Sequence, residues 1–336
     1  STPAAITSGL AAATRQGALI KGGLALEQLG RVKTIAFDKT GTLTEGKPTV
    51  TDVLSVNGTD NDLLAAAASI EMGSHHPLAK GIVYHAEQQG ISLVHADNRK
   101  TLAGIGVEGI FLGKKIKISA PSKLDLVLEN VIRQQIMTLE QEGKTVVVVL
   151  EEGRLRGLIA LQDTLREDAK AALADLRSLG INGVMLTGDN TRSAAAIAAE
   201  LKIDFRANLL PEDKVAAIMA LNQQQATAMV GDGINDAPAM KAASIGIAMG
   251  SGTDVALETA DAALTHNRLQ GLPDMIRLSR ATNANIRQNI TIALGLKAVF
   301  LVTTLLGLTG LWLAVLADSG ATALVTANAL RLLRKR

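Results

Sequence analysis

Three short apolar runs in this sequence each end at a turn of small residues that carries an aspartate. They are residues 34–38 (Thr-Ile-Ala-Phe-Asp), 184–189 (Val-Met-Leu-Thr-Gly-Asp) and 228–232 (Ala-Met-Val-Gly-Asp). Helix-forming sequence precedes and follows the second run, up to Leu179 and from Thr191 onward. Such alternation of strands and helices predicts an α/β fold with a doubly wound parallel sheet. These sheets bind ligands at the carboxyl ends of their strands, so we expect the three aspartates to meet at one edge.

The first run delivers Asp38 into a turn rich in hydroxylated residues, Asp-Lys-Thr-Gly-Thr-Leu-Thr at 38–44. Backbone amides around Thr40 to Thr42 are expected to cradle a phosphoryl group there, which favours Asp38 as a nucleophile. A lone Asp-Lys-Thr would usually do no more than cap a turn. The seven-residue string, however, resembles the phosphorylation signature of P-type ATPases, and this resemblance implies that Asp38 accepts the γ-phosphoryl group of ATP.

The other motifs resemble those of the haloacid-dehalogenase superfamily in their order along the chain. The resemblance implies that Thr187 hydrogen-bonds a phosphoryl oxygen, and that Lys214, in the Leu-Pro-Glu-Asp-Lys string, neutralises its charge. Asp38, Asp232 and Asp236 would repel one another without a cation, and Mg²⁺ with oxygen ligands fits them. The expected catalytic set is Asp38, Thr40, Thr187, Gly188, Asp189, Lys214, Asp232, Asn235 and Asp236, with Asp38, Thr40 and Asp232 as the Mg²⁺ ligands.

Thr40 separates two kinds of enzyme within that superfamily. Phosphatases commonly place an aspartate two residues after the nucleophile as the general acid and base, and a threonine cannot deprotonate the hydrolytic water. A long-lived phosphoenzyme is therefore expected, as a pump requires. In P-type ATPases a separate actuator domain supplies the base, and the resemblance places that domain before Ser1.

An insert is expected from the Gly46-Lys-Pro48 turn to about Gly153, because catalytic motifs flank it. It carries Glu71-Met-Gly-Ser-His-His-Pro77, predicted to lie on a continuing helix, and Gly104-Ile-Gly106. A histidine before a proline is a weak signal by itself. Together the two strings resemble the nucleotide-binding domain of heavy-metal P-type ATPases. The resemblance implies that Glu71 and His76 hold adenine and that Gly104 and Gly106 admit the nucleotide.

Residues 104–109 also match the Gly-x-Gly-x-x-Gly fingerprint of NAD-binding proteins. That fingerprint must lie between a strand and a helix, whereas an alternating, strand-like run follows Gly109, so an NAD site is rejected. His75, His85 and His95 have no partners at metal-ligand spacing and are expected at the surface. A helix at 132–139 and a strand at 146–150 are expected to close the insert.

Residues 290–317 contain one charge, Lys297, and the apolar tract continues beyond Asp318. This length predicts two membrane helices that turn near Gly307 to Gly310. Basic residues precede the tract at Arg277, Arg280 and Arg287 and follow it at Arg331, Arg334, Lys335 and Arg336. By the positive-inside rule, both ends of the hairpin are expected in the cytoplasm.

Charged side chains are energetically unfavourable at membrane depth, so Lys297 and Asp318 are expected to serve a function there. Counted from the turn, their depths differ by about 5 Å, so they can reach each other. A purely structural ion pair remains compatible with this geometry. The layout, with Asp318-Ser-Gly320 in the last helix, resembles zinc, cadmium and lead exporting ATPases. It implies that Asp318 binds the transported ion and that Lys297 is its counter-charge.

Bulk properties restrict the alternatives. The 34 lysines and arginines against 32 aspartates and glutamates leave a net charge of +2, without the basic field of a nucleic-acid binder. Absence of cysteine excludes disulfides, thiolate metal sites and cysteine catalysis within these residues. The start has no initiator methionine and does not resemble a signal peptide, so we expect a segment of a longer protein whose Cys-Pro-Cys metal ligands lie upstream.

The sequence is thus interpreted as the carboxyl-terminal part of a bacterial metal-exporting P-type ATPase, in the plasma membrane with cytoplasmic catalytic domains. Its expected partners are ATP, Mg²⁺, membrane lipid, the missing amino-terminal segments and Zn²⁺, Cd²⁺ or Pb²⁺, among which the sequence does not choose. Its expected parts are a membrane-helix end and stalk (1–30), a phosphorylation domain (31–46 and 154–268), a nucleotide-binding domain (47–153), and a stalk with two membrane helices (269–336). The rivals are a membrane-tethered phosphatase and a non-catalytic nucleotide-binding fragment.

Overall fold

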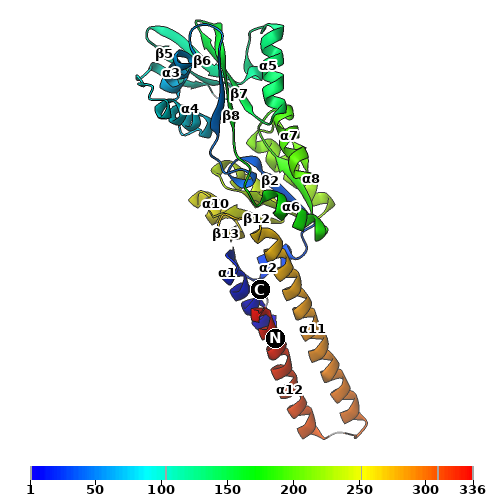
Figure 1. The fold of residues 1–336 in the computed structure, drawn as a ribbon. Helices are drawn as coiled ribbons and strands as arrows, with labels where there is room; N and C mark the ends of the chain where they lie inside the picture. Colours follow the sequence, from blue (N-terminus) through cyan, green and yellow to red (C-terminus); the bar gives the residue numbers. More distant parts are fainter. Residues whose placement is uncertain (1, 103, 251, 309, 335–336) are drawn as a thin grey trace. The chain divides into compact units, whose positions relative to one another are not determined.

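The computed structural model describes residues 2–102, 104–250, 252–308 and 310–334 (Figure 1). Asp318 lies in a described helix, but its side chain is outside the described part. The chain forms two compact units. The first comprises residues 1–38, 167–184 and 210–336, and the second comprises residues 39–166 and 185–209.

A seven-stranded sheet forms the centre of the α/β fold. Its strands are β1 (Ala18–Ile20), β2 (Thr34–Asp38), β9 (Asn182–Leu186), β10 (Asp204–Arg206), β11 (Thr227–Gly231), β12 (Ile245–Met249) and β13 (Ala262–Leu264), in the order β1-β13-β12-β11-β2-β9-β10. β11 pairs in parallel with both β2 and β12, and β12 pairs in parallel with β13. Every residue of β2, β11 and β12 is buried, which explains why these strands read as continuous apolar runs. The predicted α/β fold is confirmed.

Helices connect these strands, as the sequence pattern predicted. They are α6 (Ala169–Ser178), α7 (Thr191–Leu201), α8 (Pro211–Gln224), α9 (Ala237–Ala242) and α10 (Asp254–Thr259). Local signals place their starts: the side chain of Asn190 accepts a hydrogen bond from the Ser193 amide at the start of α7, and α8 begins with a proline.

The first 30 residues, expected to form the end of a membrane helix and a stalk, also contain a strand. α1 (Thr2–Arg15) and α2 (Gly23–Leu29) are helical, but β1 lies between them and pairs antiparallel with β13. Gly17 has a φ of 78°, which turns the chain out of α1 into the strand. The strand forms because the edge of a sheet offers it backbone partners, which the local sequence does not reveal.

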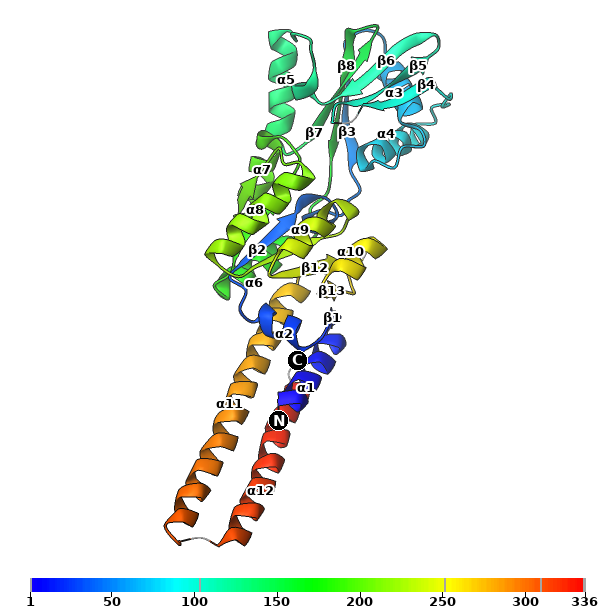
Figure 2. The same cartoon turned by 180° about the vertical axis from the view of Figure 1, so that it is seen from behind.

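The second unit contains a six-stranded sheet with the order β3-β8-β7-β6-β5-β4. Its strands are β3 (Thr49–Ser55), β4 (Asp97–Leu102), β5 (Gly106–Phe111), β6 (Lys114–Ser119), β7 (Thr145–Glu151) and β8 (Arg154–Gln162), and each paired neighbour is antiparallel. Helices α3 (Asp60–Glu71) and α4 (Pro77–Gln88) cover one face, and α5 (Asn130–Gln141) covers the other (Figure 2).

Strand β7 shows why this sheet needs a helical layer on both faces. Val147 and Val149 pack in the core under α3 and α4, whereas Val146, Val148 and Leu150 pack in the core under α5. Side chains alternate between the faces of a strand, so a continuous run of valines supplies both cores.

The predicted helix through Glu71 and His76 is interrupted. α3 ends at Glu71, and α4 begins at Pro77 with His76 as its N-cap. Gly73 in the connection has a φ of 73°, and a proline is preferred at the first position of a helix. Glu71 and His76 therefore lie at the facing ends of two helices and not on one.

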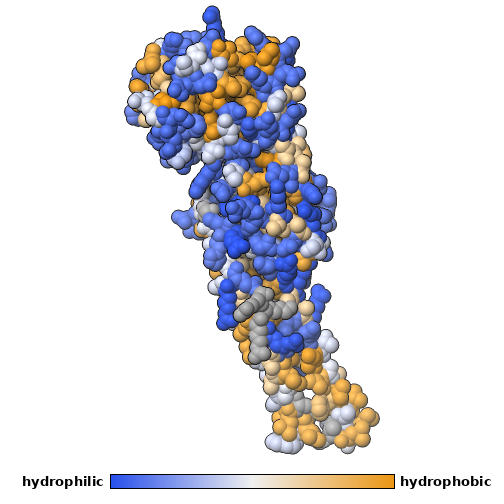
Figure 3. Space-filling view, in the orientation of Figure 1, coloured by the Kyte–Doolittle hydropathy of each residue, from blue (hydrophilic) through white to orange (hydrophobic). Residues whose placement is uncertain are grey.

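The carboxyl-terminal part is a helical hairpin of α11 (Gly271–Leu305) and α12 (Leu311–Leu330), followed by the short helix η4 (Arg331–Arg334). The first part of α11 is buried against the first unit through Leu272, Ile276 and Leu278, whereas Leu294 and Leu301 are each 62% exposed. Hydrophobic side chains gather over the end of the hairpin (Figure 3). Among the described residues, α11 is long and apolar enough to span a membrane.

Candidate active site

Two neighbouring strands carry acids at the same edge of the seven-stranded sheet. β2 ends at Asp38, and β11 ends at Gly231, one residue before Asp232. A short 3₁₀ turn, Ile234–Asp236, then returns the chain, and carboxylate oxygens of Asp38, Asp232 and Asp236 lie within 4.8 Å of one another. A Cβ atom at Gly231 would lie 2.7 Å from the side chain of Asp236, so this close return requires a glycine.

Helix α8 supplies the cation of this cluster. The ammonium of Lys214, in its first turn, donates hydrogen bonds to Oδ1 of Asp38 and, at 2.8 Å, to Oδ1 of Asp236. All three side chains are buried, with 7% of Asp38, 8% of Lys214 and 3% of Asp236 exposed. Burial opposes ionisation of the lysine, but the two carboxylates outweigh this effect and raise the pKa of Lys214. The lysine is therefore held charged beside Asp38.

The carboxyl group of Asp38 is under opposing influences. Burial raises its pKa most, Asp236 raises it further, and Lys214 lowers it, with a resulting value of about 7. Ionisation of all three acids beside this one ammonium would leave an excess of negative charge. The carboxylate oxygens and this excess charge fit a hard divalent cation such as Mg²⁺.

In the second unit, the loop after Asp38 is fixed by side chains from distant sequence. Arg166 donates to the backbone oxygens of Thr42 and Gly41, both at 2.8 Å, and Asp163 accepts a hydrogen bond from the Thr44 hydroxyl. The hydroxyl Oγ1 of Thr42 is buried without a hydrogen-bond partner among the described residues. The sequence pattern did not identify Arg166 and Asp163, although their Asp-x-x-Arg string directly follows β8.

The same unit places Thr187, Gly188 and Asp189 in the turn after β9. The side chain of Asp189 forms an ion pair with Lys39, which is only 5% exposed, and its amide donates to the Thr187 hydroxyl at 3.1 Å. Gly188 is exposed and lies close to the backbone oxygen of Leu209. Lys39 is thus a second buried lysine that sequence reasoning assigned no role.

The remaining members of the expected catalytic set lie nearby in sequence. Thr40 is half-buried with an extended backbone (φ −74°, ψ 125°), and Asn235 is exposed in the 3₁₀ turn before Asp236. The two hydrogen bonds of the Lys214 ammonium go to Asp38 and Asp236 and involve neither Thr40 nor Asn235.

The expected nucleotide residues occupy two loops of the second unit. Glu71 ends α3, and burial raises its pKa to about 7, opposed by the positive charge of Arg99. His76 accepts a hydrogen bond from the Leu78 amide at the start of α4. Loss of solvent around the imidazole lowers the pKa of His76, which the carboxylate of Asp189 partly offsets.

Gly104 and Gly106 form the connection between β4 and β5. Gly104 has a φ of 70° with open space at its Cβ position, and a Cβ at Gly106 would lie 1.9 Å from the backbone oxygen of Ile118. Gly104 thus leaves its backbone open to close approach by a ligand, whereas Gly106 lets β5 pair closely with β6. Gly109 lies within β5 and β6 comes next, so strands occupy the run after Gly109, as expected when the NAD alternative was rejected. His75 and His95 are exposed and His85 is half-buried.

In the hairpin, Lys297 lies eight residues before the end of α11, and Asp318 lies seven residues after the start of α12. At 1.5 Å per residue, these positions are about 12 Å and 11 Å from the hairpin turn. The backbone therefore places both residues at nearly the same level. The side chain of Asp318 lies outside the described residues.

Sequence profiles of haloacid dehalogenase-like hydrolases match residues 32–244 and, in a second profile, residues 213–276. This chain belongs to the haloacid dehalogenase-like hydrolases. Among members of that family, it is 63% identical over 337 residues to zinc/cadmium/lead-transporting P-type ATPases of Shigella sonnei (strain Ss046) and Escherichia coli (strain K12). The match covers 100% of this chain and 46% of each relative, so this hydrolase-family chain spans about half the length of these relatives.

Solved structures agree with this relationship. The crystal structure of a zinc-transporting PIB-type ATPase in the E2.Pi state has a TM-score of 0.78 and 63% identity, and the match covers 99% of this chain and 55% of that one. The catalytic domain of the CPx-ATPase CopB-B has a TM-score of 0.62 and 33% identity, and the match covers 79% of this chain and 97% of that one. The predicted resemblance of this haloacid dehalogenase-like chain to heavy-metal P-type ATPases is confirmed.

Proposed function

We propose that this chain is the catalytic and carboxyl-terminal membrane part of an ATP-driven exporter of Zn²⁺, Cd²⁺ or Pb²⁺ that forms an aspartyl phosphate on Asp38. The observation that carries the proposal is the cluster of Asp38, Asp232 and Asp236, in which the Lys214 ammonium bridges Asp38 and Asp236. The proposed transport activity is that of a longer protein similar to the related ATPases, about half of whose length this chain spans.

In the proposed reaction, an ionised oxygen of Asp38 attacks the γ-phosphorus of ATP, and the bond to the β–γ bridging oxygen breaks so that ADP leaves. Lys214 favours the ionised form of Asp38 beforehand and neutralises the transferred group afterward. Thr187 donates its hydroxyl hydrogen to a phosphoryl oxygen, and Gly188 leaves room for that group. Asp189 and Asn235 are assigned supporting positions around it.

Asp38, Asp232 and Thr40 would hold Mg²⁺, with Thr40 contributing its backbone oxygen or hydroxyl. A bound Mg²⁺ would supply charge stabilisation to the phosphoryl oxygens. Asp236 keeps its place through Lys214, and the excess negative charge of the acids supports a cation at this position.

The insert would bind the nucleotide base. Glu71 and His76 are proposed to hold adenine, and the open turn of Gly104 and Gly106 is proposed to admit the nucleotide. The proposed division is a stalk (1–30), a phosphorylation domain (31–46 and 154–268), a nucleotide-binding domain (47–153), and a stalk with two membrane helices (269–336).

The hairpin of α11 and α12 is proposed to cross a bacterial plasma membrane twice, with the catalytic domains in the cytoplasm and lipid around the exposed apolar residues. Asp318 is proposed as a ligand of the transported ion and Lys297 as its counter-charge. The nearly equal levels of the two residues support this pairing.

Zinc uptake into inverted vesicles that contain the full-length transporter tests the proposal. ATP-dependent uptake that requires Asp38 is the expected result. Release of phosphate from simple phosphate monoesters without stimulation by zinc would instead favour a membrane-tethered phosphatase, the alternative that Thr40 disfavours. ATP binding without phosphorylation would favour a nucleotide-binding fragment.

A further inference from the structure

Three asparagine side chains join α11 to α12 where the apolar part of the hairpin begins. Asn328 of α12 donates to Oδ1 of Asn289 at 2.9 Å, Asn289 donates to Oδ1 of Asn285 at 3.0 Å, and Asn285 donates to the backbone oxygen of Asn328 at 2.8 Å. This closed ring of hydrogen bonds is called the amide ring below. Asn285 is 6% exposed and Asn289 is fully buried.

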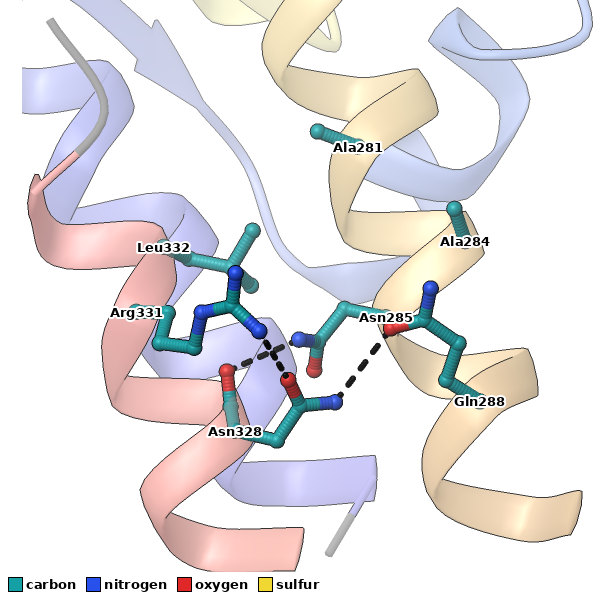
Figure 4. A pocket seen from close by; sticks show the side chains of 7 residues that line it. All are labelled: Ala281, Ala284, Asn285, Gln288, Asn328, Arg331 and Leu332. Atoms are coloured by element: carbon teal, nitrogen blue, oxygen red, sulfur yellow. Dashed lines mark hydrogen bonds between the residues drawn. The ribbon is translucent and has the colours of Figure 1, made fainter. Parts of the chain in front are cut away.

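The amide ring lies beside a cavity of about 330 Å³ lined by residues of α11, α12 and η4 (Figure 4). Arg331 donates to Oδ1 of Asn328 at 3.4 Å, and Asn328 donates to exposed Gln288 at 3.4 Å. These longer, outer contacts surround the ring without closing it. The three shorter bonds are therefore the ones that tie the two helices together.

The amide ring fixes the axial register of α11 relative to α12. Asn328 of α12 bonds to both Asn285 and Asn289 of α11, so along the helix axis it lies level with the point midway between them, at position 287. Lys297 lies ten residues beyond that level on α11, and Asp318 lies ten residues before Asn328 on α12. At 1.5 Å per residue, both are about 15 Å from the ring. The ring therefore sets Lys297 opposite Asp318.

A slip of one helix along the other would break the hydrogen bonds of this ring. Buried amides that lose their partners in an apolar environment are unfavourable, so the ring tolerates only the register in which all three bonds form. Between apolar side chains in lipid, by contrast, no comparable penalty distinguishes one register from another. A polar group that specifies register in this way is well attested in helical assemblies.

We propose that Asn285, Asn289 and Asn328 are positioning residues for ion transport, which hold Lys297 and Asp318 at one level and thereby set the affinity of the transported-ion site. This inference rests on the proposed function, in which those two residues form that site. It assigns to the asparagines no contact with the ion. Their effect passes through the axial placement of the two helices.

A double-mutant cycle in the full-length transporter tests this inference. Asn289→Leu is made alone and together with Lys297→Ala, and the measured quantity is the zinc concentration that gives half-maximal phosphorylation by ATP. Asn289 and Lys297 are eight residues, or about 12 Å, apart on α11, a separation at which independent effects usually add. Coupling between them is therefore the signature of positioning.

Asn289→Leu alone is expected to raise the half-saturating zinc concentration about three- to tenfold, the range for one interhelical polar contact in a membrane. In the Lys297→Ala background, the same substitution is expected to change it less than about twofold. Gln288→Leu, at the exposed neighbouring residue, is the matched control and is expected to change it less than about twofold. Phosphorylation by inorganic phosphate reports the folded fraction of each variant.

An equal effect of Asn289→Leu in both backgrounds, or no effect in either, overturns the inference. If Asn289→Leu gives too little folded protein, Asn289→Ser removes the amide without adding bulk and replaces it in the cycle. Failure of the proposed function has a different signature. In that case Asp318→Asn retains normal zinc dependence, whatever Asn289 does.

Discussion

The ammonium of Lys214 donates a hydrogen bond to Oδ1 of Asp38 across 176 positions of the sequence, and both side chains are buried. Lys214→Met should lower the rate of phosphorylation by ATP about 100-fold or more, because the developing charge loses a preorganised donor. It should also destabilise the fold, since a buried ion pair that loses one partner typically costs about 3–5 kcal/mol. Labelled phosphate incorporation and thermal unfolding measure the two effects.

Lys241→Met, in the neighbouring helix α9, is the control for Lys214→Met because Lys241 is exposed. It should leave both measurements unchanged. A Lys214→Met protein that is phosphorylated at the original rate would contradict the role given to this lysine.

Glu71 predicts a pH dependence of ATP binding. Burial raises the pKa of Glu71 from its ordinary 4.5 to about 7, so its ionised form, the proposed acceptor for the adenine amino group, dominates only above that pH. ATP affinity should therefore rise as pH increases from 6 to 8, by up to about tenfold if only the ionised form binds. Binding of a fluorescent ATP analogue to the detergent-solubilised protein at several pH values provides the measurement.

Glu71→Gln should remove this pH dependence and leave only the titration of the nucleotide itself. The pKa of His76 is lowered from 6.5, so His76 is mostly neutral above that pH and contributes little to the change. An unaltered pH profile in Glu71→Gln would exclude Glu71 as its source.

His76 is expected to serve nucleotide affinity and not phosphoryl transfer. His76→Gln should weaken ATP binding about tenfold, the effect of one lost hydrogen bond or ring contact, while phosphorylation by inorganic phosphate stays intact. His75→Gln, at the adjacent exposed histidine, should change neither quantity. Loss of phosphorylation by inorganic phosphate in His76→Gln would contradict this division of roles.

The fold was predictable where one local signal sufficed. β2 and β11 are buried strands that end next to acids, and α7 begins at its asparagine cap, so apolar runs and capping residues locate them. β1 was not predictable, because Ala18–Ile20 becomes a strand only through pairing with β13, more than 240 positions later. The break between α3 and α4 was missed although Gly73 and Pro77 mark it.

The residues of the candidate site were predictable from the sequence, but which of them contact one another was not. Asp38, Lys214 and Asp236 follow from their motifs, but nothing local indicates that one ammonium bridges the two acids. The ion pair of Lys39 with Asp189 joins side chains 150 positions apart and likewise depends on the folded chain. Sequence motifs name the chemistry, and tertiary contacts decide which groups meet.

Asp318→Asn should abolish zinc binding at the membrane site and zinc-stimulated ATPase activity in the full-length transporter. Lys297→Ala should retain binding and slow release, because the proposed counter-charge no longer replaces the departing ion. Each charge, if unpaired at membrane depth, costs about 3 kcal/mol on insertion scales, so the amount of inserted protein is measured as well. Normal zinc transport by Asp318→Asn would leave Asp318 as only the structural partner of Lys297.

The most direct test of the central claim is whether Asp38 itself becomes phosphorylated. With labelled ATP and Mg²⁺, the full-length protein should incorporate phosphate in an acid-stable form that hydroxylamine removes, as expected for an acyl phosphate. Asp38→Asn should incorporate none, while Asp204→Asn, at an exposed residue outside the acidic cluster, should retain the hydroxylamine-sensitive label. Hydroxylamine-sensitive labelling that persists in Asp38→Asn would contradict the account.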